Sequence, residues 1–148
     1  MNQSIRVLIA DRDINFSRDL QSFLDKQENI RVIGIAQDGQ GAVNSCKTEL
    51  PDLVLMDLHL PVLDSIKAIE AIVAQNERIK IVGISSTPDD HYALEAIKSG
   101  ARGYIEKNGE SDRYHAILKA IRQVAEGEVI LNPMLASSIL EEFCRLTE

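Results

Sequence analysis

Five short apolar runs recur along the chain, and segments with helical spacing separate them. The runs are IRVLIA (5–10), RVIGIA (31–36), DLVLMD (52–57), KIVGIS (80–85) and RGYIEK (102–107). Most are continuously apolar instead of alternating, which is typical of parallel strands that are covered on both faces. The alternation of strand and helix signals therefore predicts a doubly wound α/β domain, a five-stranded parallel sheet with helices on both faces.

The segments between the runs carry apolar stripes at helical spacing. The first and last stripes are Phe16, Leu20, Phe23, Leu24 and Tyr114, Ile117, Leu118, Ile121, Val124. The fourth helix has the clearest boundaries. We expect Thr87 to be its N-cap, Pro88 to take its first position, and Gly100 to end it in a left-handed conformation.

Length and charge exclude several classes of protein. The 148 residues suffice for one domain with a substantial core. Because 16 Lys plus Arg face 23 Asp plus Glu, the net charge is −7, and direct binding to nucleic acid or to anionic membranes is not expected. No apolar run approaches the roughly 20 residues that span a bilayer, and a secretory signal pattern is absent. Cys46 and Cys144 stand alone, so we expect a cytoplasmic protein with reduced thiols.

Four residues with complementary chemistry end predicted strands, namely Asp11, Asp57, Ser85 and Lys107. In doubly wound sheets ligands bind beyond the carboxyl ends of the strands. Residues that are far apart in sequence are therefore expected to meet at one edge of the sheet. Any one of them could be an ordinary charged strand end, but four together favour a site.

The setting of Asp57, DLVLMDLHLPVLDSI, places a carboxylate at a strand end before a Pro-containing loop. Such a carboxylate can take a phosphoryl group and form an aspartyl phosphate. Lys107 would neutralise phosphoryl oxygens and the Ser85 hydroxyl would donate a hydrogen bond. Asp11 would help to hold Mg²⁺, which takes one or two protein carboxylates and keeps several waters. The alternatives are a strand-end cap for Asp57 and a solvated lysine for Lys107.

Four motifs, VLIADRD, VLMDLHLP, IVGISS and GARGYIEKN, occur in that order between Ile5 and Gly127. This stretch resembles the receiver domain of bacterial two-component response regulators. GARGYIEKN and the later AIRQVAEGEVILNP resemble the NarL/FixJ type. The resemblance implies a flavodoxin-like fold with strand order 2-1-3-4-5.

The same resemblance assigns roles to individual residues. It implies that Asp57 is the phosphoacceptor, Lys107 the conserved lysine and Ser85 the switch hydroxyl. Tyr104 stands at the aromatic switch position, which reorients in the family. Asp11, Asp57 and the backbone carbonyl of His59 would be the metal ligands.

Arg12 departs from the family pattern because it occupies the position of the second acidic residue. An arginine has no acceptor and stays charged, so it cannot ligate a metal. Asp13 is expected to start the first helix as an N-cap. Arg12 could lie against Asp57 as a built-in cation and stabilise the phosphorylated form. Alternatively it turns into solvent, and Asp11 with Asp57 binds Mg²⁺ weakly. Either way we expect weakened Mg²⁺ affinity.

The tail is expected to be separate from the receiver at residues 1–127. Residues 128–148 read as a linker and a C-terminal helix, with Asn132 and Pro133 as its cap and first turn. The helix carries apolar residues on two adjoining stripes, Leu135, Ile139, Phe143, Leu146 and Ala136, Leu140, Cys144. Packing on its own domain, dimerisation and contact with a following domain are the alternatives.

The leading hypothesis is a phosphorylation-controlled signalling module that switches conformation to control an output domain or partner. Its expected partners are a sensor histidine kinase or other phosphodonor and a second copy of the chain. We expect either that a DNA-binding output domain was trimmed from the chain or that the receiver is free-standing. The alternative is a pseudo-receiver, which uses the fold for interaction without phosphoryl chemistry. An enzyme is not expected, since aspartate-nucleophile phosphatases of the haloacid dehalogenase type need a second Asp where His59 stands.

Overall fold

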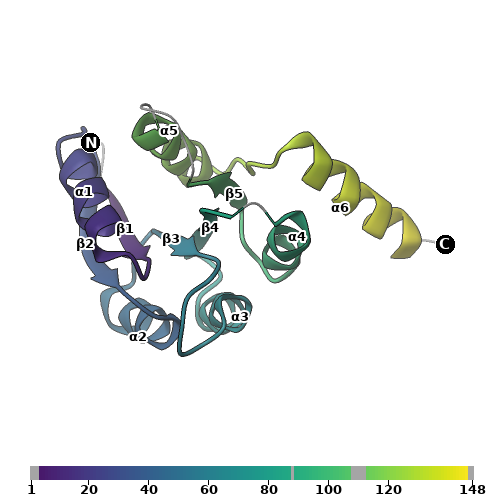
Figure 1. The fold of residues 1–148 in the computed structure, drawn as a ribbon, viewed down its shortest axis with the longest axis horizontal. Helices are drawn as coiled ribbons and strands as arrows, with labels where there is room; N and C mark the ends of the chain where they lie inside the picture. Colours follow the sequence, from purple (N-terminus) through teal and green to yellow (C-terminus); the bar gives the residue numbers. More distant parts are fainter. Residues whose placement is uncertain (1–3, 88, 108–112, 147–148) are drawn as a thin grey trace.

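The computed structural model describes residues 4–87, 89–107 and 113–146, which form one five-stranded parallel sheet with helices on both faces (Figure 1). The strands are β1 (Ile5–Ala10), β2 (Ile30–Ala36), β3 (Leu53–Asp57), β4 (Lys80–Ser85) and β5 (Gly103–Glu106). Their order in the sheet is β2-β1-β3-β4-β5, and every neighbouring pair is parallel. The predicted fold class and strand order are confirmed.

The helices are α1 (Ile14–Asp25), α2 (Gly39–Glu49), α3 (Ser65–Gln75), α4 (Asp90–Lys98), α5 (Arg113–Ala125) and α6 (Pro133–Leu146). Two apolar clusters fill the space between the sheet and these helices. Leu8 and Val54 pack with α2, α3 and α4 on one face, whereas Val7 and Leu53 pack with α1 and α5 on the other. Because successive strand residues enter opposite clusters, both faces of the sheet are apolar, which explains the continuous apolar runs.

Local signals explain most helix boundaries. Asp13 is the N-cap of α1, and its side chain accepts a hydrogen bond from Phe16 N, as predicted. Gly100 follows α4 with a φ of +126°, a region that favours glycine. The prediction of Thr87 as the cap of α4 is wrong, because Asp89 caps that helix and accepts from the Tyr92 amide. Pro88 lies outside the described residues.

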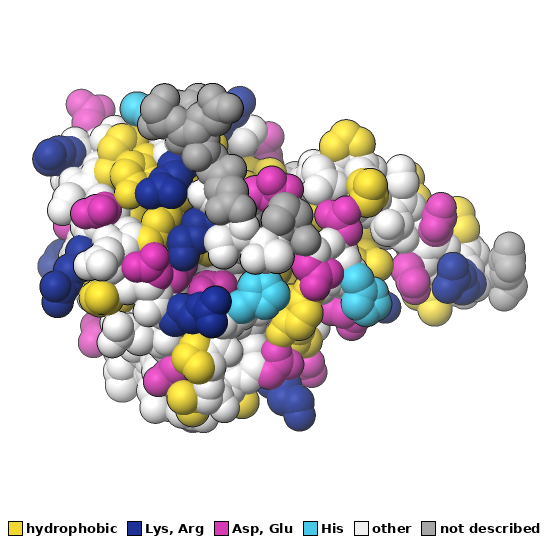
Figure 2. Space-filling model, viewed as in Figure 1, with side chains coloured by type: hydrophobic (Ala, Val, Ile, Leu, Met, Phe, Trp, Pro, Cys, Tyr) yellow, Lys and Arg dark blue, Asp and Glu magenta, His cyan; other side chains and the backbone are white. Residues whose placement is uncertain are grey.

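The C-terminal segment packs on the domain near its start, and further along α6 Glu142 pairs with Lys98 of α4 at 3.9 Å. Ile130 forms a parallel bridge beside Gly103 at the edge of β5, and Asn132 caps α6 by accepting from Leu135 N at 2.8 Å. Leu135 is buried against the core, whereas Leu140 and Phe143 are exposed. α6 contacts α4 and extends beyond it (Figure 1), with hydrophobic and charged side chains mixed along it (Figure 2). The division at residue 127 stays a prediction.

Among the described residues, no helix is long and apolar enough to cross a bilayer.

Candidate functional site

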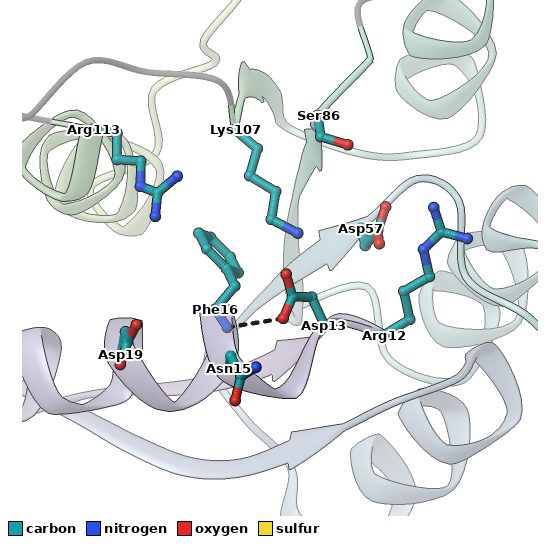
Figure 3. A pocket seen from close by; sticks show the side chains of 9 residues that line it. All are labelled: Arg12, Asp13, Asn15, Phe16, Asp19, Asp57, Ser86, Lys107 and Arg113. Atoms are coloured by element: carbon teal, nitrogen blue, oxygen red, sulfur yellow. Dashed lines mark hydrogen bonds between the residues drawn. The ribbon is translucent and has the colours of Figure 1, made fainter.

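The carboxyl ends of the central strands open into a pocket of about 400 Å³. Asp57 is the last residue of β3, and Lys107 directly follows β5. Nine residues line the pocket (Figure 3): Arg12, Asp13, Asn15, Phe16, Asp19, Asp57, Ser86, Lys107 and Arg113. The sheet topology thus brings together Asp57, Lys107 and Arg12, which sequence reasoning placed in one site.

Asp11 lies beneath this pocket in a buried ion pair with Lys107. The lysine Nζ is 3.0 Å from Asp11 Oδ2 and 3.1 Å from Oδ1. The Asp11 side chain is fully buried and that of Lys107 is 12% exposed. The Asp13 amide donates to Asp11 Oδ1 at 2.8 Å. Asp11 Oδ1 therefore accepts both hydrogen bonds, whereas Oδ2 lies close to the ammonium but accepts no hydrogen bond from the described residues.

Burial raises the pKa of Asp11 above its ordinary value, because the charged carboxylate loses its hydration. The Asp13 amide and the Lys107 ammonium act against this shift by favouring the charged form. The negative charge of Asp57 nearby raises the Asp11 pKa further. The charge of Asp57 therefore adds to the free-energy cost of ionising Asp11.

Asp57 is held by its own loop. Its side chain is largely buried, and Oδ1 accepts a hydrogen bond from the His59 amide at 2.9 Å. The buried hydroxyl of Ser65 donates to the Asp57 carbonyl at 2.8 Å and accepts from Leu60 N at 3.1 Å. Ser65 thus braces the turn that carries the phosphoacceptor candidate, a role that sequence reasoning missed.

Three cations and three carboxylates line the pocket: Arg12, Lys107, Arg113, Asp13, Asp19 and Asp57. The Arg12 side chain points along the pocket on the Asp57 side (Figure 3). Arg12 itself is exposed, and among the described residues it forms no ion pair with Asp57 or any other carboxylate. Its charge therefore stays available at the mouth of the pocket.

Ser85 and Tyr104 do not reach the pocket, although Ser85 ends β4 as predicted. The Ser85 hydroxyl donates to the Thr87 carbonyl at 2.7 Å and accepts from Thr87 N at 3.2 Å. Ser86 lines the pocket in its place. Tyr104 is buried in the cluster under α4, where burial raises the pKa of its phenol, and its hydroxyl has no hydrogen-bond partner among the described residues. The switch roles of both residues stay predictions.

Sequence reasoning did not assign Phe16 or Arg113 to the site. Phe16 counted as one member of an amphipathic stripe, yet its ring lies 4.2 Å from Lys107 Nζ. Arg113 begins α5, five residues after the GARGYIEKN motif, and its cationic side chain next to an apolar stripe was the only available signal. Packing of α1 and α5 on one face of the sheet brings both to the pocket.

The residues present offer Mg²⁺ a minimal set of protein ligands. Mg²⁺ needs one or two carboxylates and keeps several waters, and Asp57 with Asp11 meets that minimum. Asp11, however, already pairs with Lys107, and Arg12 adds a positive charge at the pocket. Within the described ranges no three acidic, His or Cys side chains cluster tightly enough to hold a metal. The site thus offers few donors and two competing cations.

Comparisons with known proteins agree with this architecture. Residues 7–119 match the response regulator receiver domain family. The chain is 34% identical over 136 residues to the transcriptional regulatory protein LiaR of Bacillus subtilis, covering 92% of this chain and 63% of LiaR. It is 26% identical over 142 residues to the transcriptional regulatory protein DegU of Brevibacillus brevis, covering 96% and 59%. The chain therefore spans about three fifths of the length of these relatives.

Solved structures show the same fold. A LuxR-family two-component response regulator from Aurantimonas sp. SI85-9A1 superposes with a TM-score of 0.82 at 24% identity, covering 96% of this chain and 99% of that one. The receiver domain of the putative response regulator NarL from Mycobacterium tuberculosis gives 0.77 at 27% identity, covering 85% and 99%. The resemblance inferred from the sequence motifs is confirmed: this chain belongs to the family of response regulator receiver domains.

Proposed function

We propose that this receiver accepts a phosphoryl group on Asp57 and changes conformation in response, as a cytoplasmic signalling module and not as an enzyme. The observation that carries the proposal is the position of Asp57. Its carboxylate lies at the end of the central strand β3 and lines a pocket with the cations Lys107 and Arg12. Phosphoryl transfer needs a placed nucleophile and positive charge around the phosphoryl oxygens, and this pocket supplies both.

Each neighbour of Asp57 has a role that follows from its contacts. The His59 amide bonds Asp57 Oδ1 and the Ser65 hydroxyl holds the Asp57 loop, so Oδ2 would be the attacking atom. Lys107 balances the buried Asp11 charge until a phosphoryl dianion arrives, and can then turn toward it. On phosphorylation, the Ser85 hydroxyl would move away from Thr87 and the Tyr104 ring would reorient within its cluster.

Receiver domains bind Mg²⁺ at their acidic pocket, and we propose that Arg12 weakens this binding here. Asp11, Asp57 and the His59 carbonyl would hold the ion. When bound, Mg²⁺ neutralises phosphoryl oxygens during transfer. The Arg12 guanidinium can neutralise the same oxygens through a fork that matches phosphate geometry. Arg12 would thereby make the reaction less dependent on the metal.

The second candidate is a pseudo-receiver that binds a partner without phosphorylation. Two observations favour it: Arg12 replaces an acidic residue at the pocket, and Asp11 is already neutralised by Lys107. A chain with this internal pairing needs neither a metal nor a phosphoryl group to balance its acidic charge. Phosphorylation of Asp57 discriminates between the two functions.

Intact-protein mass after incubation with a small-molecule phosphodonor, with and without Mg²⁺, tests the proposal. We expect a phosphoryl adduct that forms without Mg²⁺ and is absent in Asp57→Asn. Arg12→Asp restores an acidic side chain and is expected to make the adduct depend on Mg²⁺. A wild-type adduct that requires Mg²⁺ would mean that Arg12 is merely tolerated. Absence of an adduct in wild type and in Arg12→Asp under both conditions would support the pseudo-receiver.

Partners follow from the relatives, which are named transcriptional regulatory proteins. We propose that a sensor histidine kinase or another phosphodonor modifies residues 1–127, and that residues 128–148 connect the receiver to a DNA-binding output domain or to a partner. A phosphorylation-dependent homodimer is a further expectation. Sedimentation of the chain with and without the phosphodonor tests it, and an unchanged sedimentation coefficient despite full phosphorylation would contradict it.

A further inference from the structure

The outer part of the pocket contains a cation that the proposed chemistry does not use. Arg113 is the first residue of α5 and lines the pocket with Asp57 and Lys107. In the part of the chain that the structure describes, it forms no ion pair with a carboxylate. Its hydrogen bond there, from Nη2 to the Tyr114 hydroxyl, is 3.4 Å long and therefore weak. With respect to the described residues, most donors of this guanidinium are thus left for a ligand.

Two aromatic rings hold the Arg113 guanidinium in place. Its Cζ lies 5.1 Å from the centroid of the Tyr114 ring and 5.5 Å from that of Phe16. An arginine over aromatic rings is attracted by their negative faces, while its N–H groups remain free to bind oxygen atoms. The contacts therefore orient Arg113 without consuming its capacity to bind an anion.

The order of side chains across the pocket suggests what Arg113 binds. Figure 3 shows Arg113 and Arg12 at opposite sides, with Lys107 and Asp57 between them. In phosphoryl transfer the nucleophile and the leaving group lie roughly in line on opposite sides of phosphorus. With Asp57 as the nucleophile and the phosphoryl group beside Lys107, the leaving group would extend toward Arg113.

We propose that Arg113 binds the leaving group of the phosphodonor and makes the pocket prefer acyl phosphates to phosphoramidate. This inference rests on the proposed function of Asp57. With acetyl phosphate, an Asp57 oxygen forms the new bond to phosphorus, the bond from phosphorus to the acyl oxygen breaks, and acetate leaves with the electron pair without needing a proton. With phosphoramidate in its nitrogen-protonated form, an Asp57 oxygen forms the new bond to phosphorus, the bond from phosphorus to nitrogen breaks, and neutral ammonia leaves with the electron pair. Only the carboxylate leaving group offers Arg113 an anion.

Initial rates of adduct formation with the two donors, followed by intact mass, test the inference in the full chain. We expect Arg113→Gln to lower the rate with acetyl phosphate about tenfold, as loss of one charge-assisted contact does. The rate with phosphoramidate should change less than about twofold. Lys119→Gln removes a charge from an exposed position of α5 outside the pocket and should change neither rate. Equal losses with both donors, or no loss, would overturn the inference.

A binding measurement separates this inference from the proposed function. Acetyl phosphate is titrated into Asp57→Asn, which cannot be phosphorylated there, and binding is followed by NMR shifts of pocket amides. In the double variant Asp57→Asn, Arg113→Gln, acetyl phosphate is expected to bind about tenfold more weakly than in Asp57→Asn alone. Unchanged affinity overturns the role of Arg113 even if Asp57 is phosphorylated in the wild type. Absence of any wild-type adduct, together with an Arg113-dependent affinity, would instead reject only the phosphoacceptor function.

Discussion

The Asp57 pocket has an inner layer, Asp11 and Lys107, and an outer layer, Arg12 and Arg113. The two layers differ in whether their positive charges are paired with carboxylates. In the inner layer Lys107 pairs with a fully buried carboxylate, that of Asp11. In the outer layer Arg12 and Arg113 line the pocket without a carboxylate partner among the described residues. A buried charge needs its partner for the fold to be stable, whereas an unpaired charge at the surface contributes little to stability. We therefore expect substitutions in the inner layer to change the free energy of unfolding, and substitutions in the outer layer to change ligand binding.

The largest expected effect is in the inner layer. Lys107→Met leaves the Asp11 carboxylate buried without its cation and is expected to lower the free energy of unfolding by about 3 kcal/mol. Arg12→Gln, the matched change in the outer layer, should alter it by less than about 0.5 kcal/mol. Urea denaturation measures both. Equal effects would remove the distinction between the layers.

A double variant sharpens the same comparison. Lys107→Met combined with Asp11→Asn removes both charges, so we expect most of the lost stability to return. If the two substitutions change the free energy of unfolding additively, Asp11 and Lys107 do not stabilise each other. The ion pair would then not be the source of the stability of the inner layer.

The next effect concerns Ser65, whose hydroxyl braces the loop after Asp57. Ser65→Ala removes a hydroxyl that bonds both the Asp57 carbonyl and the Leu60 amide, so we expect a loss of about 2 kcal/mol. Ser45→Ala, in α2, removes a hydroxyl that has no hydrogen bond among the described residues and should change stability by less than about 0.5 kcal/mol. Chemical denaturation of both variants gives the comparison, and a loss no larger than that of the control would show that the brace is dispensable.

The pH dependence of stability reports on the Asp11 carboxyl. Its pKa in the folded chain lies above the ordinary value of 3.8, so the folded state holds this proton more tightly than the unfolded state. The titration of Asp11 therefore favours folding at acid pH, and that contribution is lost as the pH rises from 3.8 through the folded pKa. We expect the unfolding free energy of wild type minus that of Asp11→Asn to fall over this window. A difference that grows with pH would contradict the raised pKa.

The smallest effect is expected in the core under α4. Tyr104→Phe deletes a buried hydroxyl that has no partner among the described residues, so stability should stay within about 0.5 kcal/mol or rise. Tyr92→Phe deletes a hydroxyl that donates to Asp64 and is expected to cost about 1 kcal/mol. Thermal unfolding of both variants compares them, and a larger loss at Tyr104 would mean that its hydroxyl has a partner in solution.

Much of the fold follows from local patterns in the sequence. The runs 5–10 and 52–57 were identified as strands because burial on both faces demands apolar residues at every position. Asp13 is predictable as a cap because a short acidic side chain just before a helix can accept from a free amide of the first turn, and the structure shows this bond from Phe16 N. The position of the α4 cap was wrong since both Thr87 and Asp89 suit such a site, and only the path of the chain after β4 selects Asp89.

The sequence by itself determined that Asp11, Asp57 and Lys107 would meet, because parallel strands align their carboxyl ends at one edge of the sheet. Only the tertiary structure decided how they meet. It buries Asp11 against Lys107, turns Ser85 toward Thr87, and brings Phe16 and Arg113 to the pocket from α1 and α5. The physical reason is that strand order follows from short-range periodicity, whereas the direction of a side chain depends on packing between elements that are distant in the chain.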